Sequence, residues 1–165
     1  MVYLILMAAL VVCDQLVKKW TVSTFAAPVG SSVSTADAAI PGIKGVVELT
    51  RVHNFGAAWS SFSGMRWLLI AVTVVLMAVL AFFWIKKIVR HPLGKLSIAL
   101  IIAGGIGNLI DRAVNGYVVD MFNLTFMNYP VFNVADICVV AGAIGGAIYY
   151  LWLYDKFDAK KDKEA

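Results

Sequence analysis

Two aspartates in the second half of the chain are the strongest candidates for chemistry. Asp120 follows a short apolar stretch, Val118-Val119, and Asp136 lies near the start of a long apolar segment. Two carboxyls in a partly desolvated pocket cannot both ionise easily, so one of them keeps its proton. The ionised carboxyl can take a proton from water, while the protonated one polarises a carbonyl and later protonates a leaving amine. If the fold brings the two together, they predict aspartic peptidase chemistry.

Amide and guanidinium side chains accompany these aspartates in an otherwise apolar sequence. Such groups can orient a peptide backbone through hydrogen bonds, and a glycine lets that backbone approach closely. The residues that we expect to bind substrate are Asn54, Gly56, Asn108, Arg112 and Asn133.

Other polar residues are better explained as structural support. Asp14 and Lys18 are four residues apart, so they lie on one helical face and can pair. Asp111 precedes Arg112 near the end of another predicted helix. A structural interpretation also stays open for Asp136, because a carboxylate three residues after Asn133 fits a helix cap.

The elements that must position these residues are membrane helices. The chain has 165 residues, of which 61% are hydrophobic and only 15% are charged, against about 25% charged residues in soluble domains. A helix needs roughly 20 apolar residues to cross a bilayer. Four segments approach that length when the polar ends of the first and third are included: about 2–20, 66–85, 95–112 and 134–154.

The basic residues predict the orientation of these spans. Lysines and arginines gather at 86–95, between the second and third spans, and at 156–163, after the fourth. By the positive-inside rule, the 86–94 loop and the 155–165 tail are cytoplasmic. Both termini are then cytoplasmic, 21–65 and 113–131 are external, and the polar residues converge near the outer leaflet. Since the net charge of +4 lies largely on these flanks, nucleic acid is not an expected partner.

Part of the first external segment is β-prone. Residues 46–53 alternate between two faces and are bounded by turn formers, whereas 21–45 is a loop rich in small residues. We therefore expect a mostly α, polytopic membrane protein. It has four transmembrane helices and a small external β-rich segment on the membrane surface, and residues 1–165 form a single membrane domain.

Other classes of site are less well supported by the residues. No His or Cys cluster predicts a metal site or a cofactor, and Cys13 and Cys138 both fall inside predicted spans. Only His53 is an external histidine, and no nucleophile motif accompanies it. Two alternatives stay open: a small transporter with intramembrane charges, and a membrane scaffold held by buried ion pairs.

Several sequence blocks together resemble bacterial lipoprotein signal peptidase, also called signal peptidase II, over nearly the whole chain. Their order and spacing match the family, although each block alone is weak. The blocks are Asp14-Gln15-x-x-Lys18, Pro41-Gly42 to Val52-His53-Asn54-x-Gly56-Ala57-Ala58, Gly104-Gly105-x-Gly107-Asn108-x-x-Asp111-Arg112, Gly116-x-Val118-x-Asp120 and Phe132-Asn133-x-Ala135-Asp136.

The resemblance implies an aspartic endopeptidase of the bacterial cytoplasmic membrane that needs no metal or cofactor. It removes the signal peptide from diacylglyceryl-modified prolipoproteins and cleaves before the lipidated cysteine. Asp120 and Asp136 align with the catalytic pair. The implied partners are these substrates, membrane lipids and cyclic peptide inhibitors such as globomycin, and we expect a monomer.

Overall fold

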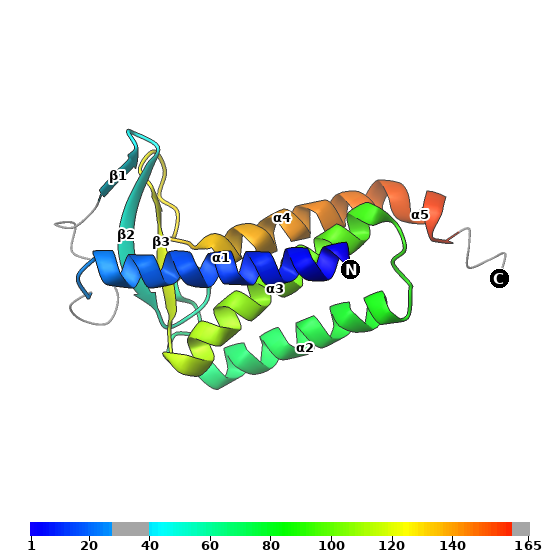
Figure 1. Ribbon diagram of the computed structural model, residues 1–165, viewed down its shortest axis with the longest axis horizontal. Helices are drawn as coiled ribbons and strands as arrows, with labels where there is room; N and C mark the ends of the chain where they lie inside the picture. Colours follow the sequence, from blue (N-terminus) through cyan, green and yellow to red (C-terminus); the bar gives the residue numbers. More distant parts are fainter. Residues whose placement is uncertain (28–39, 160–165) are drawn as a thin grey trace.

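The computed structural model describes residues 1–27 and 40–159 (Figure 1). Residues 28–39 of the predicted 21–45 loop and residues 160–165 of the predicted basic tail lie outside the described residues. The long helices are α1 (Val2–Thr24), α2 (Arg66–Ile85), α3 (Pro92–Val114) and α4 (Val134–Ile148), which continues as the π-helical turn η3 (Tyr149–Leu153) and α5 (Tyr154–Phe157). The strands are β1 (Ile40–Ile43), β2 (Val47–Asn54) and β3 (Val118–Leu124), and a 3-10 turn, η2, covers Ala58–Ser60.

Within the described residues, three helices are long and apolar enough to cross a membrane: α2, α3 and the continuous helix Val134–Phe157. The prediction of four transmembrane helices is not confirmed, because α1 is not among them. It has 23 residues, but every 18-residue stretch of it contains Asp14, Lys18 and Lys19. In α2, by contrast, no residue is buried within the protein, as expected for an apolar helix that faces lipid.

Helix α3 contacts the other three long helices and forms the centre of the bundle. Small residues allow the close approach of α3 and α4. A Cβ on Gly104 would meet the carbonyl oxygen of Ala135, and one on Gly142 would lie 2.8 Å from the carbonyl oxygen of Ser97. The sequence pattern of glycines in both helices is therefore explained by packing.

Two helices have ends that differ from the predicted bounds. Helix α3 begins at Pro92 rather than near 95, because proline suits the first helical position and the ring of His91 accepts a hydrogen bond from the Leu93 N–H. Helix α1 continues past residue 20 to Thr24. Its C-terminal carbonyls at Val22 and Phe25 accept hydrogen bonds from Arg51 of β2.

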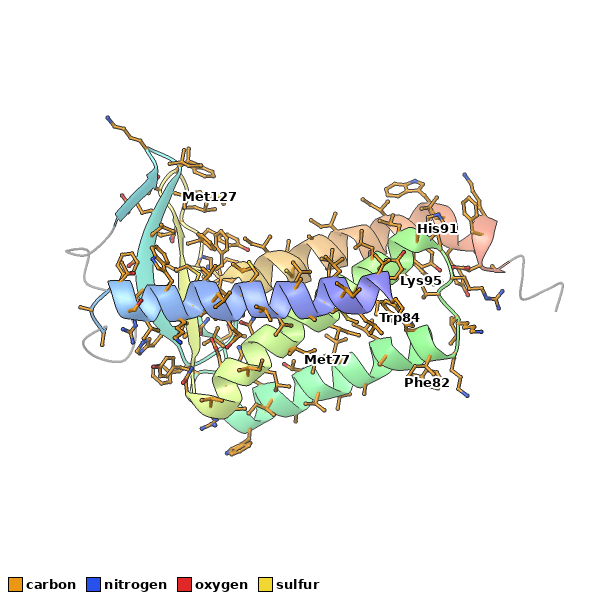
Figure 2. The ribbon with its side chains drawn as sticks, in the orientation of Figure 1. Met77, Phe82, Trp84, His91, Lys95 and Met127 are labelled. Carbon is orange, nitrogen blue, oxygen red and sulfur yellow. The ribbon has the colours of Figure 1, made fainter. Side chains whose placement is uncertain are left out.

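The strands form an antiparallel sheet, in the order β1-β2-β3, at one end of the bundle (Figure 1). The predicted strand at 46–53 corresponds closely to β2. At the opposite end, Figure 2 shows Trp84, His91 and Lys95, whereas Met127 lies in the loop beyond β3. The sheet and the 86–95 loop are thus at opposite ends of the bundle.

Candidate active site

Asp120 is positioned by the pairing of β2 with β3. Val52 lies opposite Asp120, and Asn54 lies opposite Val118. Because side chains two residues apart share a face, Asn54 and Asp120 meet on one side of the sheet. The amide of Asn54 donates to Asp120 Oδ2 over 3.0 Å, and Asp120 is 1% exposed.

Asp136 is positioned by the start of α4. The Asn133 side chain accepts a hydrogen bond from the Asp136 N–H, and the Asp136 carboxylate accepts one from the Asn133 N–H. This reciprocal pair is the predicted helix cap. The cap leaves Asp136 Oδ1 available, and the amide of Asn108 on α3 donates to it over 2.8 Å.

Asn133 links the two aspartates. It is fully buried, and its amide nitrogen donates to Asp120 Oδ1 over 2.6 Å and to Asn108 Oδ1 over 3.1 Å. Asn108 in turn holds Asp136. All four carboxyl oxygens of the two aspartates therefore accept hydrogen bonds, which fixes both carboxyls in orientation.

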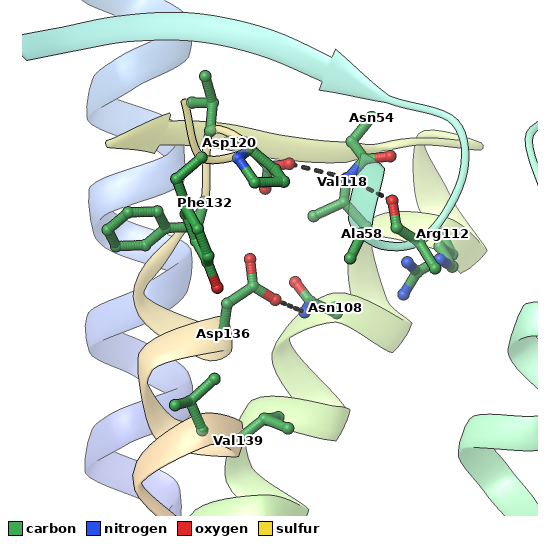
Figure 3. A pocket seen from close by; sticks show the side chains of 14 residues that line it. Asn54, Ala58, Asn108, Arg112, Val118, Asp120, Phe132, Asp136 and Val139 are labelled. Atoms are coloured by element: carbon green, nitrogen blue, oxygen red, sulfur yellow. Dashed lines mark hydrogen bonds between the residues drawn. The ribbon is translucent and has the colours of Figure 1, made fainter. Parts of the chain in front are cut away.

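Both aspartates line one cavity of about 240 Å³, which we call the aspartate cavity (Figure 3). Asn54, Asn108 and Arg112 also line it. Its remaining walls are mostly apolar: Ala57, Ala58, Val118, Tyr129, Pro130, Val131, Phe132, Val139 and Val140. A cavity with few polar groups in an apolar wall favours a partly desolvated reaction.

Asp120 titrates near neutrality. Burial raises its pKa, the negative charge of Asp136 raises it further, and hydrogen bonds from Asn54 and Asn133 offset part of that rise, so that the pKa is about 7. A carboxyl with such a pKa can hold a proton at physiological pH and release it during a reaction. The pair can thus contain one acid and one base.

Behind the cavity lies a buried ion cluster. Lys18 Nζ lies 2.9 Å from Asp14 Oδ2 and 3.1 Å from Asp111 Oδ2, and it also donates to Asn108 Oδ1 over 3.1 Å. Asp14 accepts a hydrogen bond from the Ala135 N–H. The predicted pair of Asp14 and Lys18 is present, and the cluster joins α1, α3 and α4.

Arg112 and Gly56 fix the loop that follows β2. A guanidinium N–H of Arg112 donates to the Gly56 carbonyl over 2.9 Å, and the Gly56 N–H donates to Asn54 Oδ1 over 2.9 Å. Gly56 is buried and is not among the residues that line the aspartate cavity. Its backbone therefore holds Asn54 and Arg112 in place.

Sequence reasoning assigned no role to two residues that support the site. Gln15 donates to Asp14, Asp111 and the Gly107 carbonyl. Arg51 holds the end of α1 and also donates to His53, whose pKa is lowered by burial and by the Arg51 charge. The sequence places Arg51 in a predicted strand with alternating faces, which indicates that its side chain lies on one face of the sheet. It does not indicate the partners of Arg51, because they are carbonyl groups of Val22 and Phe25, far away in the sequence.

Among residues 1–27 and 40–159, no group of three or more His, Cys, Asp or Glu side chains is arranged as metal ligands would be. The polar groups of the aspartate cavity are two carboxyls, two amides, one guanidinium and the Tyr129 hydroxyl. This set matches hydrogen bonding to a peptide backbone.

Comparison with known proteins identifies the class. The family model described as signal peptidase II matches residues 6–152. The lipoprotein signal peptidase of Lactiplantibacillus plantarum is 41% identical over 143 residues, covering 87% of this chain and 89% of that protein. The lipoprotein signal peptidase of Clostridium acetobutylicum is 46% identical over 124 residues, covering 73% and 80%.

The fold comparison agrees. A solved bacterial membrane enzyme, determined by the in meso method at 2.3 Å resolution, superposes with a TM-score of 0.78 and 28% identity, covering 91% of this chain and 87% of that one. A membrane-embedded aspartic peptidase is the class that these matches define. The chain belongs to the signal peptidase II family, and it removes signal peptides from prolipoproteins in a bacterial membrane.

Proposed function

We propose that Asp120 and Asp136 are the catalytic pair of this peptidase. The observation that carries the proposal is their position on one cavity, with every carboxyl oxygen held by an asparagine. Preorganised groups of this kind lower the barrier because they need not rearrange during the reaction. The ion cluster of Asp14, Lys18 and Asp111 serves as structural support.

The two carboxyls divide the work of hydrolysis. The ionised carboxyl takes a proton from water as the water oxygen attacks the scissile carbonyl carbon. The protonated carboxyl donates a hydrogen bond to the carbonyl oxygen. Collapse of the intermediate then breaks the C–N bond, and the amine leaves with a proton from the pair. Since Asp120 has a pKa of about 7, it can hold the proton that the pair needs at neutral pH.

Arg112, Asn54 and Asn108 bind the peptide around the scissile bond. Asn54, Asn108 and Arg112 line the aspartate cavity, while Asn133 and Gly56 hold these side chains in place. We infer that cleavage falls before the cysteine that carries the diacylglyceryl group. Globomycin, a cyclic peptide, would compete for the same polar groups.

The protein acts as a monomer with four membrane spans, of which α1 is the first. Lys18 and Asp14 on α1 are shielded by α3 and α4 rather than exposed to lipid, which supports a membrane position for this helix despite its charges. By the positive-inside rule, the basic residues at 86–95 and after 155 support a cytoplasmic position for both termini. The sheet and the aspartate cavity then lie at the outer leaflet, within a single membrane domain.

Cleavage of a defined substrate tests this function. The purified protein is incubated with a diacylglyceryl-modified prolipoprotein and with the same protein lacking the lipid, and products are sized by mass spectrometry. We expect cleavage before the modified cysteine only, and inhibition by globomycin. Equal cleavage of the unmodified protein would contradict the proposed specificity.

A further inference from the structure

A second pocket, of about 480 Å³, lies where α2 ends and α3 begins. Figure 2 shows two of its residues, Trp84 and Lys95, at the end of the bundle opposite the sheet. We call it the basic pocket, because most of the side chains that line it are cationic. They are Lys87, Arg90 and Lys95, and the remaining two are Trp84 and Ile85.

The positive charge of the basic pocket is poorly compensated by carboxylates. The 86–95 segment contains four basic residues and no acidic one. Within residues 1–27 and 40–159, neither Lys87 nor Lys95 has a carboxylate at ion-pair distance. Asp158 does interact with the charge of Arg90, but its Oδ2 already accepts hydrogen bonds from the N–H groups of Arg90 and His91. An anion in the pocket would therefore supply a missing counter-charge.

The basic pocket is held in shape by contacts between three helices. The Nε of Arg90 donates to the Lys87 carbonyl over 2.9 Å. Trp84 packs edge to face on Tyr3 of α1, with ring centroids 5.5 Å apart, and the Tyr3 hydroxyl donates to the Pro92 carbonyl over 3.4 Å. Because these contacts join α1, α2 and α3 around the pocket, its side chains need little reordering when a ligand binds.

Lys87 adopts a backbone conformation that usually belongs to glycine. Its φ is 56°, in the left-handed region, and it directly follows the C-cap residue of α2, where glycine is the common choice. A lysine at this position costs conformational free energy that glycine would avoid. Strained residues of this kind are concentrated at binding sites, and the Lys87 side chain lines the basic pocket.

The apolar residues of the basic pocket belong to the lipid-facing end of α2. Ile85 is 75% exposed, and no residue of α2 is buried within the protein. The 20 residues of α2 rise about 30 Å, which matches the hydrocarbon core of a bilayer. Trp84 and Ile85 therefore lie where hydrocarbon meets head groups, a common place for tryptophan. A soluble phosphate would contact only the cations, whereas a lipid contacts the apolar residues as well.

We propose that the basic pocket binds the head group of an anionic phospholipid. The phosphodiester lies among Lys87, Arg90 and Lys95, and the acyl chains run along α2. Basic pockets between membrane helices on the cytoplasmic side suit such head groups. The leaflet follows from the proposed orientation of the spans, whereas the site itself does not depend on the aspartate pair. Since the pocket and the aspartate cavity lie at opposite ends of the bundle, this lipid is a separate molecule from the substrate.

Native mass spectrometry of the purified protein, titrated with phosphatidylglycerol in a mild neutral detergent, measures the affinity. Lys95→Gln and Lys87→Gly should each raise Kd by about fivefold, the value expected for the loss of one cation beside an anionic head group. Lys86→Gln is the matched control, because Lys86 is exposed and does not line the pocket. It loses the same charge, but its Kd should stay within about twofold of wild type, since exposed charges act through screened attraction.

Two other ligands distinguish a lipid site from its alternatives. Phosphatidylcholine with the same acyl chains should bind at least about fivefold more weakly, because its head group has no net charge. Glycerol 3-phosphate at the concentration of the lipid should not displace phosphatidylglycerol. Equal binding of phosphatidylcholine, displacement by glycerol 3-phosphate, or an equal loss of affinity in Lys86→Gln and Lys95→Gln would each overturn the proposal.

Thermal unfolding of Lys87→Gly separates lost binding from a damaged fold. Because glycine relieves the backbone strain, the Tm without lipid should equal or exceed that of wild type. With phosphatidylglycerol at about ten times the wild-type Kd, the rise in Tm should be about half that of wild type, since stabilisation follows ln(1 + [L]/Kd). A full wild-type rise in Lys87→Gly would show that the lipid binds elsewhere.

Discussion

Replacing Lys18 by methionine should destabilise the fold strongly, because it leaves two buried carboxylates without their counter-ion. The side chains of Lys18, Asp14 and Asp111 are each at most 3% exposed, and the ammonium lies about 3 Å from a carboxylate oxygen of each aspartate. Breaking a buried pair by removing one partner costs about 3–5 kcal/mol. For a chain of this size, that cost lowers Tm by roughly 10 °C.

Thermal unfolding of the purified protein in detergent, followed by tryptophan fluorescence, measures this effect. Lys19 is adjacent but exposed, so Lys19→Met is the matched control and should leave Tm within a degree or so of wild type. Lys18→Met should also lower kcat/KM at temperatures below Tm, because the Lys18 ammonium orients the Asn108 amide that faces Asp136.

A double variant tests the electrostatic origin of the loss. Lys18→Met/Asp111→Asn removes one of the two carboxylates that the ammonium neutralised. It should therefore be less destabilised than the sum of the single variants, by about 1–2 kcal/mol. The reasoning would be refuted if the losses of stability of the two single variants simply added in the double variant. It would also be refuted if Lys18→Met had the same Tm as wild type.

Three further predictions concern pH, packing and the far end of the bundle. Because the pKa of Asp120 is about 7, the pair loses its acidic proton as pH rises, so kcat/KM should fall through pH ~7 in steady-state assays; a flat profile would contradict this. Gly104→Ala forces a Cβ against the Ala135 carbonyl and should cost about 1–3 kcal/mol in thermal unfolding, whereas Gly105→Ala faces the flexible Met77 side chain and should cost clearly less. Tyr149→Phe removes the 2.5 Å hydrogen bond to Asp158. It should lower the free energy of unfolding by about 2 kcal/mol and leave kcat unchanged, because this bond lies at the end of the bundle far from the aspartate cavity. A fall in kcat with no loss of stability would contradict this prediction.

Features that depend on neighbouring residues could be predicted from the sequence. The cap formed by Asn133 and Asp136 is specified by a three-residue spacing, and the pair of Asp14 and Lys18 by a four-residue spacing. The bounds of α2 follow from an uninterrupted apolar run. In each case, the geometry of a helical turn is enough to bring the groups together.

Features that depend on how helices cross could not be predicted. Lys18 reaches Asn108 and Asp111 because α1 packs on α3 where Gly107 leaves room; a Cβ there would lie 2.6 Å from Asp14 Oδ2. Nothing in the spacing of these residues along the chain specifies that contact. Likewise, the Asn54 hydrogen bond to Asp120 requires the register between β2 and β3, which a bulge between Leu49 and Val52 shifts.

The most direct test of the catalytic pair is cleavage by its two amide variants. Asp120→Asn and Asp136→Asn are each incubated with the lipidated prolipoprotein in single-turnover experiments, with thermal unfolding measured on the same preparations. If the two carboxyls share the work of hydrolysis, both variants should fold and each should lose cleavage by at least about 1,000-fold. Near-wild-type cleavage by either folded variant would contradict the proposed pair.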